Sequence, residues 1–248
     1  MLTKRFIKRA PTYAQHAIIQ RAMAEELANI FVAHKRECKN LAIFEFGSAF
    51  GEFSTILCHT LKHAKIRCST LLCNDINNYG YIYTKAFAKN LEVDNLAFQC
   101  FDMNEIGKFL DSSFDVIASN ACLQWLNQQE VLLRLKDFLL PNGEILLSSF
   151  GKNNLWQVRE ICGVGLEYLD LEWYEKMLSP HFKIIHLYEK QYDLDFKESL
   201  EVFRHLSQSG VNALTKDFIL TKSLLKHYQE RFGGVLSFHS IFIHAQKL

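Results

Sequence analysis

The sequence contains little proline and little glycine: three prolines and eleven glycines in 248 residues. This scarcity excludes a Pro/Gly-rich linker and a long disordered tract. An excess of one charge is also missing, because 28 lysines and arginines are balanced by 27 aspartates and glutamates. The balance excludes a broadly basic surface of the kind that binds nucleic acid. We therefore expect a folded chain, long enough for one complete hydrophobic core.

Long apolar runs and paired cysteines are missing as well. No stretch reaches the roughly 18 apolar residues of a membrane helix, and the basic start of the chain lacks the apolar region of a signal peptide. The seven cysteines include no C-x-x-C pair, and cysteines and histidines lack metal-ligand spacing. The sequence therefore predicts a cytoplasmic protein with reduced, mostly buried thiols, no metal site and no membrane contact.

One stretch combines an apolar run, two glycines and an amphipathic segment. Residues 41–46 read as a buried strand, Gly47 and Gly51 as a bend, and residues 52–57 as the start of a helix. Glycines at such a turn let the backbone approach a ligand closely. Six further strands alternate with helical patterns, which predicts a doubly wound α/β fold: 69–76, 96–103, 114–120, 145–150, 182–189 and 236–245.

Acidic side chains lie at the ends of three successive predicted strands. These are Glu45, Asp75 and Asp102, and Asn120 ends the fourth strand. The carboxyl ends of parallel strands share one edge of a sheet, where ligands of open α/β folds bind. Asp75 could instead only cap the helix that follows it. Three acids at three strand ends favour a ligand site.

The pattern acid-x-Gly-x-x-x-Gly at residues 45–51 resembles motif I of the class I S-adenosylmethionine methyltransferases, with Ala49 where that family commonly has its middle glycine. The passages at 114–125 and 139–151 are also typical of that family. The resemblance implies a Rossmann-like fold, whose mostly parallel seven-stranded sheet has an antiparallel last strand. It also implies S-adenosylmethionine as cofactor, held by Glu45, Gly47, Ser48, Gly51, Asp75, Ile76, Asp102, Met103 and Asn120.

About forty residues of helical pattern separate the last two predicted strands. A crossover between strands needs only about a dozen residues, so we interpret residues 196–231 as a lid. The predicted organisation is a single domain over residues 1–248, with an N-terminal helical arm at 1–40, a cofactor-binding core at 41–150 and the lid.

The lid carries the most specific pattern. Residues 200–213, with Arg204 near their middle, resemble the malonyl-[acyl-carrier protein] O-methyltransferases of biotin synthesis. That family also shows Y-D-x-x-A-x-x-Q near its start, matched here from Tyr13 to Gln20 with Ala14 in place of the Asp. Its closing strand has a Y-H-P-I-like passage, of which His239 and Ile241 are kept. The resemblance implies methylation of the free carboxylate of a malonyl thioester on acyl carrier protein, an early step towards pimelate.

Four residues are candidates for the catalytic machinery of that reaction. We expect Arg204 to clamp the malonyl carboxylate, because a guanidinium grips a carboxylate at two points; alternatively it forms a helical ion pair with Glu201. Tyr13 orients substrate or only packs. Trp125 and His239 line the malonyl pocket or belong to the core. No general base is required, because a carboxylic acid is ionised at neutral pH.

The resemblance implies an acidic carrier protein as partner, and we expect the enzyme to be a monomer. Docking would need basic side chains, either on the arm or on the lid: Lys4, Arg5, Lys8 and Arg9, or Lys216, Lys222 and Lys226. One alternative is a methyltransferase acting on a coenzyme A thioester or a free acid. Another is a non-catalytic assembly factor, which Ala49 favours and the three acids oppose. A nucleic-acid methyltransferase is disfavoured, because no Asn/Asp-Pro-Pro-Tyr/Phe motif is present.

Overall fold

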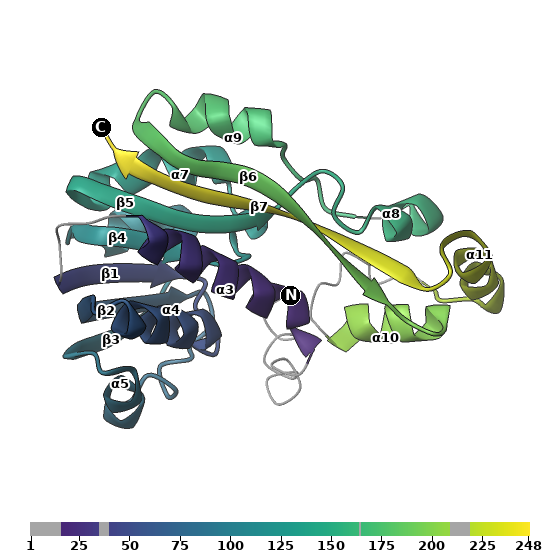
Figure 1. Ribbon diagram of the computed structural model, residues 1–248, viewed down its shortest axis with the longest axis horizontal. Helices are drawn as coiled ribbons and strands as arrows, with labels where there is room; N and C mark the ends of the chain where they lie inside the picture. The colour runs from purple at the N-terminus through teal and green to yellow at the C-terminus, as the bar shows by residue number, and fades with distance from the viewer. Residues whose placement is uncertain (1–15, 35–39, 164, 209–218) are drawn as a thin grey trace. The chain divides into compact units, whose positions relative to one another are not determined.

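The computed structural model describes residues 16–34, 40–163, 165–208 and 219–248. Its centre is a seven-stranded sheet in the order β3-β2-β1-β4-β5-β7-β6. Figure 1 shows this order from β3 to β5, with α3 in front of the sheet. The strands are β1 (Asn40–Phe46), β2 (Arg67–Asp75), β3 (Asn95–Cys100), β4 (Phe114–Ser119), β5 (Leu139–Phe150), β6 (Phe182–Asp195) and β7 (Val235–Lys247).

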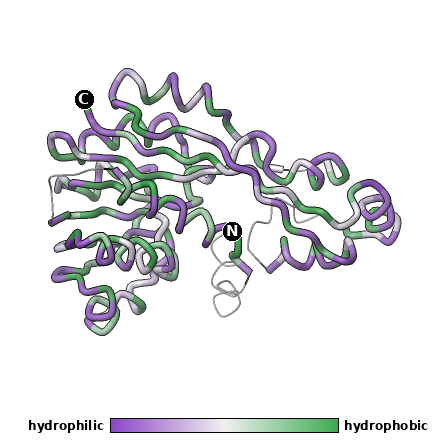
Figure 2. The backbone as a smooth tube through the Cα atoms, viewed as in Figure 1, coloured by the Kyte–Doolittle hydropathy of each residue, from purple (hydrophilic) through white to green (hydrophobic). Residues whose placement is uncertain are grey.

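The predicted fold class is confirmed. Strands β1 to β5 pair in parallel, with Phe44 of β1 between Leu72 of β2 and Ile117 of β4. The last strand, β7, runs antiparallel to both of its neighbours: the N–H of Gly151, after β5, donates to the carbonyl of His239, and the N–H of Leu248, after β7, donates to the carbonyl of His181, before β6. The apolar runs of β1 and β4 form these strands because both of their faces are covered, and Figure 2 shows both strands mostly in the hydrophobic colour. The first predicted strand is thus a central one.

Amphipathic helices connect the strands. In α4, Phe53, Leu57 and Leu61 recur at helical spacing and are buried. The other α-helices are α3 (Ile18–Ala33), α5 (Lys85–Leu91), α6 (Ile106–Phe109), α7 (Gln128–Leu135), α8 (Trp156–Cys162), α9 (Leu171–Leu178), α10 (Ser199–Gln208) and α11 (Lys222–Phe232); α4 spans Glu52–His63. Short 3-10 turns are η1 (Met103–Glu105), η2 (Leu123–Trp125) and η3 (Lys136–Phe138). Among the described residues, no helix has the length and apolar character to cross a membrane.

Two local expectations differ from the structure. The helix expected at 79–91 begins only at Lys85, because the side chain of Thr84 caps it by accepting from the backbone N–H of Phe87. The turn expected at Pro141 and Gly143 lies inside β5 as an irregularity: Phe114 pairs with Leu139, and Val116 pairs next with Glu144.

The chain divides into two compact units. The first contains residues 1–19, 150–169 and 189–240, and the second contains 20–149, 170–188 and 241–248. The organisation predicted from the sequence, one domain with a lid at 196–231, stays a prediction. Several predicted contributors to the site or to docking lie outside the described residues: Tyr13, Lys4, Arg5, Lys8, Arg9 and Lys216. Ala14 lies outside them as well.

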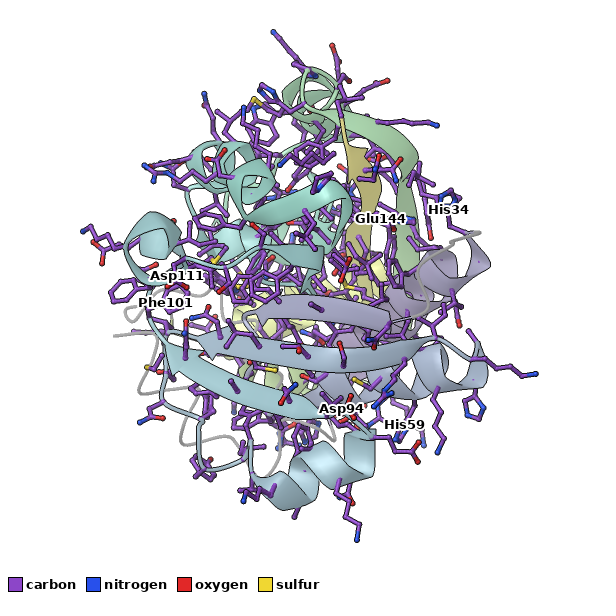
Figure 3. All side chains as sticks on the ribbon, turned by 90° about the vertical axis from the view of Figure 1, so that its left-hand side faces the viewer. His34, His59, Asp94, Phe101, Asp111 and Glu144 are labelled. Atoms are coloured by element: carbon purple, nitrogen blue, oxygen red, sulfur yellow. The ribbon has the colours of Figure 1, made fainter. Side chains whose placement is uncertain are left out.

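A buried polar pair lies at the amino ends of the parallel strands in the second unit. The Nε2 of His244 on β7 is 2.7 Å from the Oε2 of Glu144 on β5, and the rings of His34 and His186 lie within 6 Å of the His244 ring centroid, at 5.5 and 5.8 Å. In Figure 3, Phe101 follows the carboxyl end of β3, whereas Glu144 and His34 lie on the side of Asp94, which precedes β3. This cluster therefore lies at the edge opposite the strand ends that carry the candidate site.

Candidate functional site

The loop from β1 to α4 has an unusual backbone. Gly47, Ala49 and Gly51 all have positive φ angles, of 67°, 41° and 77°. A Cβ placed on Gly47 would lie 2.5 Å from the Sγ of Cys122, and one on Gly51 would lie 2.7 Å from the ring of Phe87. Both glycines are therefore required by backbone conformation and by space, which is the property expected of a loop that passes close to a ligand.

Glu45, which lies on β1 just before this loop, is buried in the second unit. One of its carboxylate oxygens accepts a 2.6 Å hydrogen bond from the hydroxyl of Ser54 on α4. Burial raises the pKa of Glu45 to about 8; the Ser54 hydrogen bond opposes this shift and the charge of Asp75 adds to it. A cation placed beside Glu45 would favour the ionised carboxylate, so the site is suited to a ligand ammonium group.

Asp75 ends β2 and is joined to the same loop. Its Oδ2 accepts from the backbone N–H of Ala49 at 3.1 Å, and its Oδ1 accepts from the backbone N–H of Asn77 at 2.8 Å. Burial raises the pKa of Asp75, and these hydrogen bonds act against the shift. The neighbouring Ile76 is 54% exposed, unlike most large apolar side chains of the unit. An exposed apolar side chain beside a carboxylate suits the flat face and the hydroxyls of a nucleoside.

Asp102 follows β3 and caps the short 3-10 turn η1. Its Oδ1 accepts from the backbone and side-chain nitrogens of Asn104, both at 2.9 Å, at the start of η1. The next residue, Met103, is buried, with 4% of its surface exposed. Both hydrogen bonds from Asn104 use one carboxylate oxygen, and a carboxylate has a second oxygen that can accept, so the capping role and a ligand role are compatible.

Asn120 is fixed by two hydrogen bonds in the second unit. Its Nδ2 donates to the carbonyl of Gln20 at 2.9 Å, and its Oδ1 accepts from the hydroxyl of Ser148 at 2.7 Å. Its amide thereby connects α3, β4 and β5. Trp125, also in this unit, is half-buried on η2 and is not part of the closed core.

Arg204 and His239 belong to the first unit. Arg204 is exposed on α10 and, among the described residues, forms no ion pair; the alternative pairing with Glu201 is absent, since Glu201 accepts from the backbone of Lys197. His239 is buried on β7: its Nδ1 accepts from Asn153 at 3.2 Å, and its Nε2 is 3.4 Å from Glu189. The guanidinium thus has no charged partner within the described ranges, whereas the imidazole lies beside Asn153 and Glu189.

Sequence reasoning did not identify Ser54, Tyr83 or Cys122. Ser54 bonds the buried carboxylate of Glu45, the hydroxyl of Tyr83 reaches the loop carbonyls, and Cys122 touches Gly47. No local pattern marks Ser54 or Tyr83, because their partners are brought near by packing. Cys122 lies inside the distinctive S-N-x-x-L-Q-W passage, and this motif is the sequence feature that indicated a site near Cys122.

The side chains and backbone groups of the site can be compared with the groups that a nucleoside-type methyl donor presents. Such a ligand presents an ammonium group, ribose hydroxyls and an adenine, which require carboxylates, backbone groups and an apolar surface. Glu45, Asp75 and Asp102 supply the carboxylates, the loop supplies the backbone, and Ile76 supplies the apolar surface. The residues present fit such a group.

Known proteins with similar sequences point in the same direction. Residues 44–147 match the family model described as a methyltransferase domain. A malonyl-[acyl-carrier protein] O-methyltransferase of Calditerrivibrio nitroreducens is 30% identical over 261 residues, which cover 100% of this chain and 97% of that protein.

Solved structures agree at the level of the fold. The YcgJ protein of Bacillus subtilis has a TM-score of 0.60 at 12% identity, covering 90% of this chain and 98% of that one. The N-methyltransferase NodS of Bradyrhizobium japonicum, in complex with S-adenosyl-L-homocysteine, has a TM-score of 0.51 at 11% identity, covering 92% and 86%. The near-complete match at 30% identity, together with the methyltransferase core, shows that the chain belongs to the malonyl-[acyl-carrier protein] O-methyltransferase family.

Proposed function

We propose that this chain transfers a methyl group from S-adenosylmethionine to the free carboxylate of a malonyl thioester on acyl carrier protein. The observation that carries the proposal is the pair of buried carboxylates, Glu45 and Asp75, on either side of a loop with left-handed backbone. This arrangement supports a nucleoside-type methyl donor, and the relative's name indicates the acceptor.

The chemistry divides between the donor and the chain's own residues. When bound, S-adenosylmethionine supplies a methyl group on a positively charged sulfur. The oxygen–methyl bond forms as the sulfur–methyl bond breaks, leaving a methyl ester and the neutral thioether of S-adenosylhomocysteine. The acceptor carboxylate needs no deprotonation at neutral pH, so the chain is not required to provide a base. Its task is to orient the carboxylate and exclude water.

Arg204 is the residue to which we assign the acceptor carboxylate. Its guanidinium is exposed and, among the described residues, has no ion-pair partner. A guanidinium can hold a carboxylate with two parallel hydrogen bonds while leaving a lone pair on oxygen for attack. Tyr13, Trp125 and His239 remain proposed contributors to the acceptor pocket. Lys222 and Lys226, exposed on α11, remain candidates for docking an acidic carrier.

The test is incubation with S-adenosylmethionine and malonyl-acyl carrier protein, followed by the mass of the intact carrier. We expect a gain of one methyl group, with Arg204→Ala lowering kcat/KM by at least about a hundredfold and leaving cofactor affinity unchanged. Arg204→Lys should recover only part of the loss, because an ammonium cannot form the paired bonds.

Arg134→Ala is the matched control. Arg134 is an exposed arginine on α7 that pairs with Glu130 four residues earlier, and its loss should not change turnover. Methylation of malonyl-coenzyme A or free malonate, but not of the carrier, would contradict the proposed acceptor. Failure to bind S-adenosylmethionine at all would contradict the proposed activity and favour a non-catalytic role.

A further inference from the structure

The tip of the β1–α4 loop has a residue that is unsuited to its backbone. Ala49 has a φ of 41°, in the left-handed region that glycine adopts readily and alanine does not. The methyltransferase motif commonly has glycine at this position. The flanking Gly47 and Gly51 also have positive φ angles. The loop therefore has a backbone conformation that favours glycine at all three positions, but the middle position is alanine.

Hydrogen bonds hold the tip on both sides of Ala49. Its N–H donates to the Oδ2 of Asp75 at 3.1 Å, which fixes the peptide before it. The hydroxyl of Tyr83 lies 3.2 Å from the carbonyl oxygen of Ser48 and 3.2 Å from that of Ala49, so its proton is shared between the two. The two peptide groups that set the φ and ψ of Ala49 are therefore both held by side chains.

Tyr83 is itself held in place by aromatic packing. Its ring stacks on Phe98 of β3, with centroids 5.0 Å apart and planes at 13°, and meets the ring of Phe87 edge-on at 5.5 Å. The residue is 9% exposed, and burial raises the pKa of its phenol, so the hydroxyl remains a proton donor. Phe87 also closes the space beside Gly51.

The segment before α5 is shaped for this contact. Residues 79–84 form turns, with Ile82 N–H donating to the carbonyl of Tyr79 and Thr84 N–H to that of Ile82. The ring of Tyr79 lies 4.8 Å from that of Phe50, next to Ala49 in sequence. The segment thus meets the loop at two neighbouring residues, and a helix starting at residue 79 would have directed these side chains differently.

We propose that Tyr83 is a positioning residue that holds the cofactor loop in the conformation that Ala49 by itself disfavours. The inference rests on the proposed function only in assigning S-adenosylmethionine to this loop. Without the phenolic hydroxyl the Ala49 peptide relaxes, the loop spends part of its time in other conformations, and the cofactor must restore the bound one. Affinity for the cofactor falls, while the methyl transfer step itself is unaffected.

The test compares wild type, Tyr83→Phe, Ala49→Gly and the double variant. Calorimetry with S-adenosylhomocysteine measures affinity. Tyr83→Phe keeps the ring and its packing, and we expect it to raise Kd about three- to tenfold, the worth of a hydrogen bond. Ala49→Gly alone should change Kd little. In the double variant, glycine adopts the left-handed backbone without support, so most of the affinity should return.

A purely structural role would not give this rescue, nor a selective effect on the cofactor. At saturating S-adenosylmethionine, Tyr83→Phe should show unchanged kcat and unchanged KM for the acceptor. Tyr81→Phe is the matched control, because Tyr81 is 69% exposed in the same segment. Wild-type affinity in Tyr83→Phe, or a double variant as weak as Tyr83→Phe, would overturn the proposal.

Amide hydrogen exchange tests the positioning role of Tyr83 independently of the proposed methyltransferase activity. Tyr83→Phe should increase exchange at residues 48–51 in the absence of any ligand, and adding Ala49→Gly should reverse the increase. This readout tests the positioning role even if wild type fails to bind S-adenosylhomocysteine, an outcome that contradicts the proposed function alone. Unchanged exchange at these residues in Tyr83→Phe would overturn the positioning role. If Tyr83→Phe fails to fold, the role is overturned as well, because the hydroxyl would then be needed by the whole unit.

Discussion

At the scale of single residues, Glu45 shows how burial changes the chemistry of a familiar motif. It is 1% exposed, and its hydrogen-bond partner is the neutral hydroxyl of Ser54, not a cation. A carboxyl group in such surroundings keeps its proton to a higher pH than it would in water. Ligand binding and the ionisation of Glu45 are therefore linked, because a cationic ligand group beside the carboxyl group would favour its ionised form.

This linkage predicts a pH-dependent stability. The pKa of Glu45 is about 8 in the folded chain and 4.5 as its ordinary value, so the unfolded chain releases a proton that the folded chain keeps between these values. The Glu45 contribution to the free energy of unfolding is complete below pH 4.5 and is lost as the pH rises to 8, by on the order of 4 kcal/mol. Glu45→Gln should remove this slope.

Urea denaturation of wild type and Glu45→Gln at pH 5, 6.5 and 8 measures this pH dependence of the free energy of unfolding. The difference in the free energy of unfolding between the two proteins should shift in favour of the variant as the pH rises. Parallel pH profiles of the two proteins would show that the carboxyl is not protonated in the folded chain. Measurements without S-adenosylmethionine are required, because a bound ammonium group would lower the pKa again.

At the scale of elements, the β1–α4 connection depends on two different properties of glycine. One is the left-handed backbone at Gly47 and Gly51, and the other is the space that Cys122 and Phe87 leave beside them. Another glycine, Gly233 at the end of α11, has a φ of 60°, but a Cβ added there would meet nothing within 4 Å. Comparing these positions separates the cost of conformation from the cost of a clash.

We expect Gly233→Ala to lower the free energy of unfolding by about 1 kcal/mol, the cost of a left-handed alanine. Gly47→Ala should cost about 3 kcal/mol or more, because its methyl group would overlap the side chain of Cys122 in addition. Denaturant midpoints of the two variants provide the comparison. Equal losses in the two variants would show that Cys122 moves aside freely.

At the scale of the whole molecule, the candidate residues divide between the two units. Glu45, Asp75, Asp102, Asn120 and Trp125 belong to one, and Arg204 and His239 belong to the other. We propose two tasks: the carboxylates of Glu45, Asp75 and Asp102 bind the methyl donor, and Arg204 binds the acceptor carboxylate.

Hydrogen exchange should separate these tasks. S-adenosylhomocysteine alone should protect residues 47–51 and 75–77, whereas malonyl-acyl carrier protein should in addition protect α10 around Arg204. Arg204→Ala should abolish the second effect and keep the first. Protection of α10 by S-adenosylhomocysteine alone, to the same extent as with both ligands, would contradict the assignment of Arg204 to the acceptor.

The sequence by itself determined the α/β fold, the strands that flank the glycine loop and the family to which the chain belongs. Apolar runs and helical spacing reveal which face of each element is buried, and a motif of fixed spacing reveals a local turn. These signals are local. They located Glu45, Gly47 and Asp75 in one neighbourhood, because parallel strands end at a common edge.

Only the tertiary structure decided how deeply Glu45 is buried, that helix α5 begins at Lys85 and not at residue 79, and that Tyr83 reaches a carbonyl 34 residues earlier in the chain. Each of these depends on the packing of elements that are distant in sequence. The burial and the hydrogen bonds of a side chain are set by the neighbours that folding brings together, so they do not follow from the type of the residue alone. In our proposal, the packing of Tyr83 against the β1–α4 loop also explains why Ala49 can occupy a backbone conformation that favours glycine.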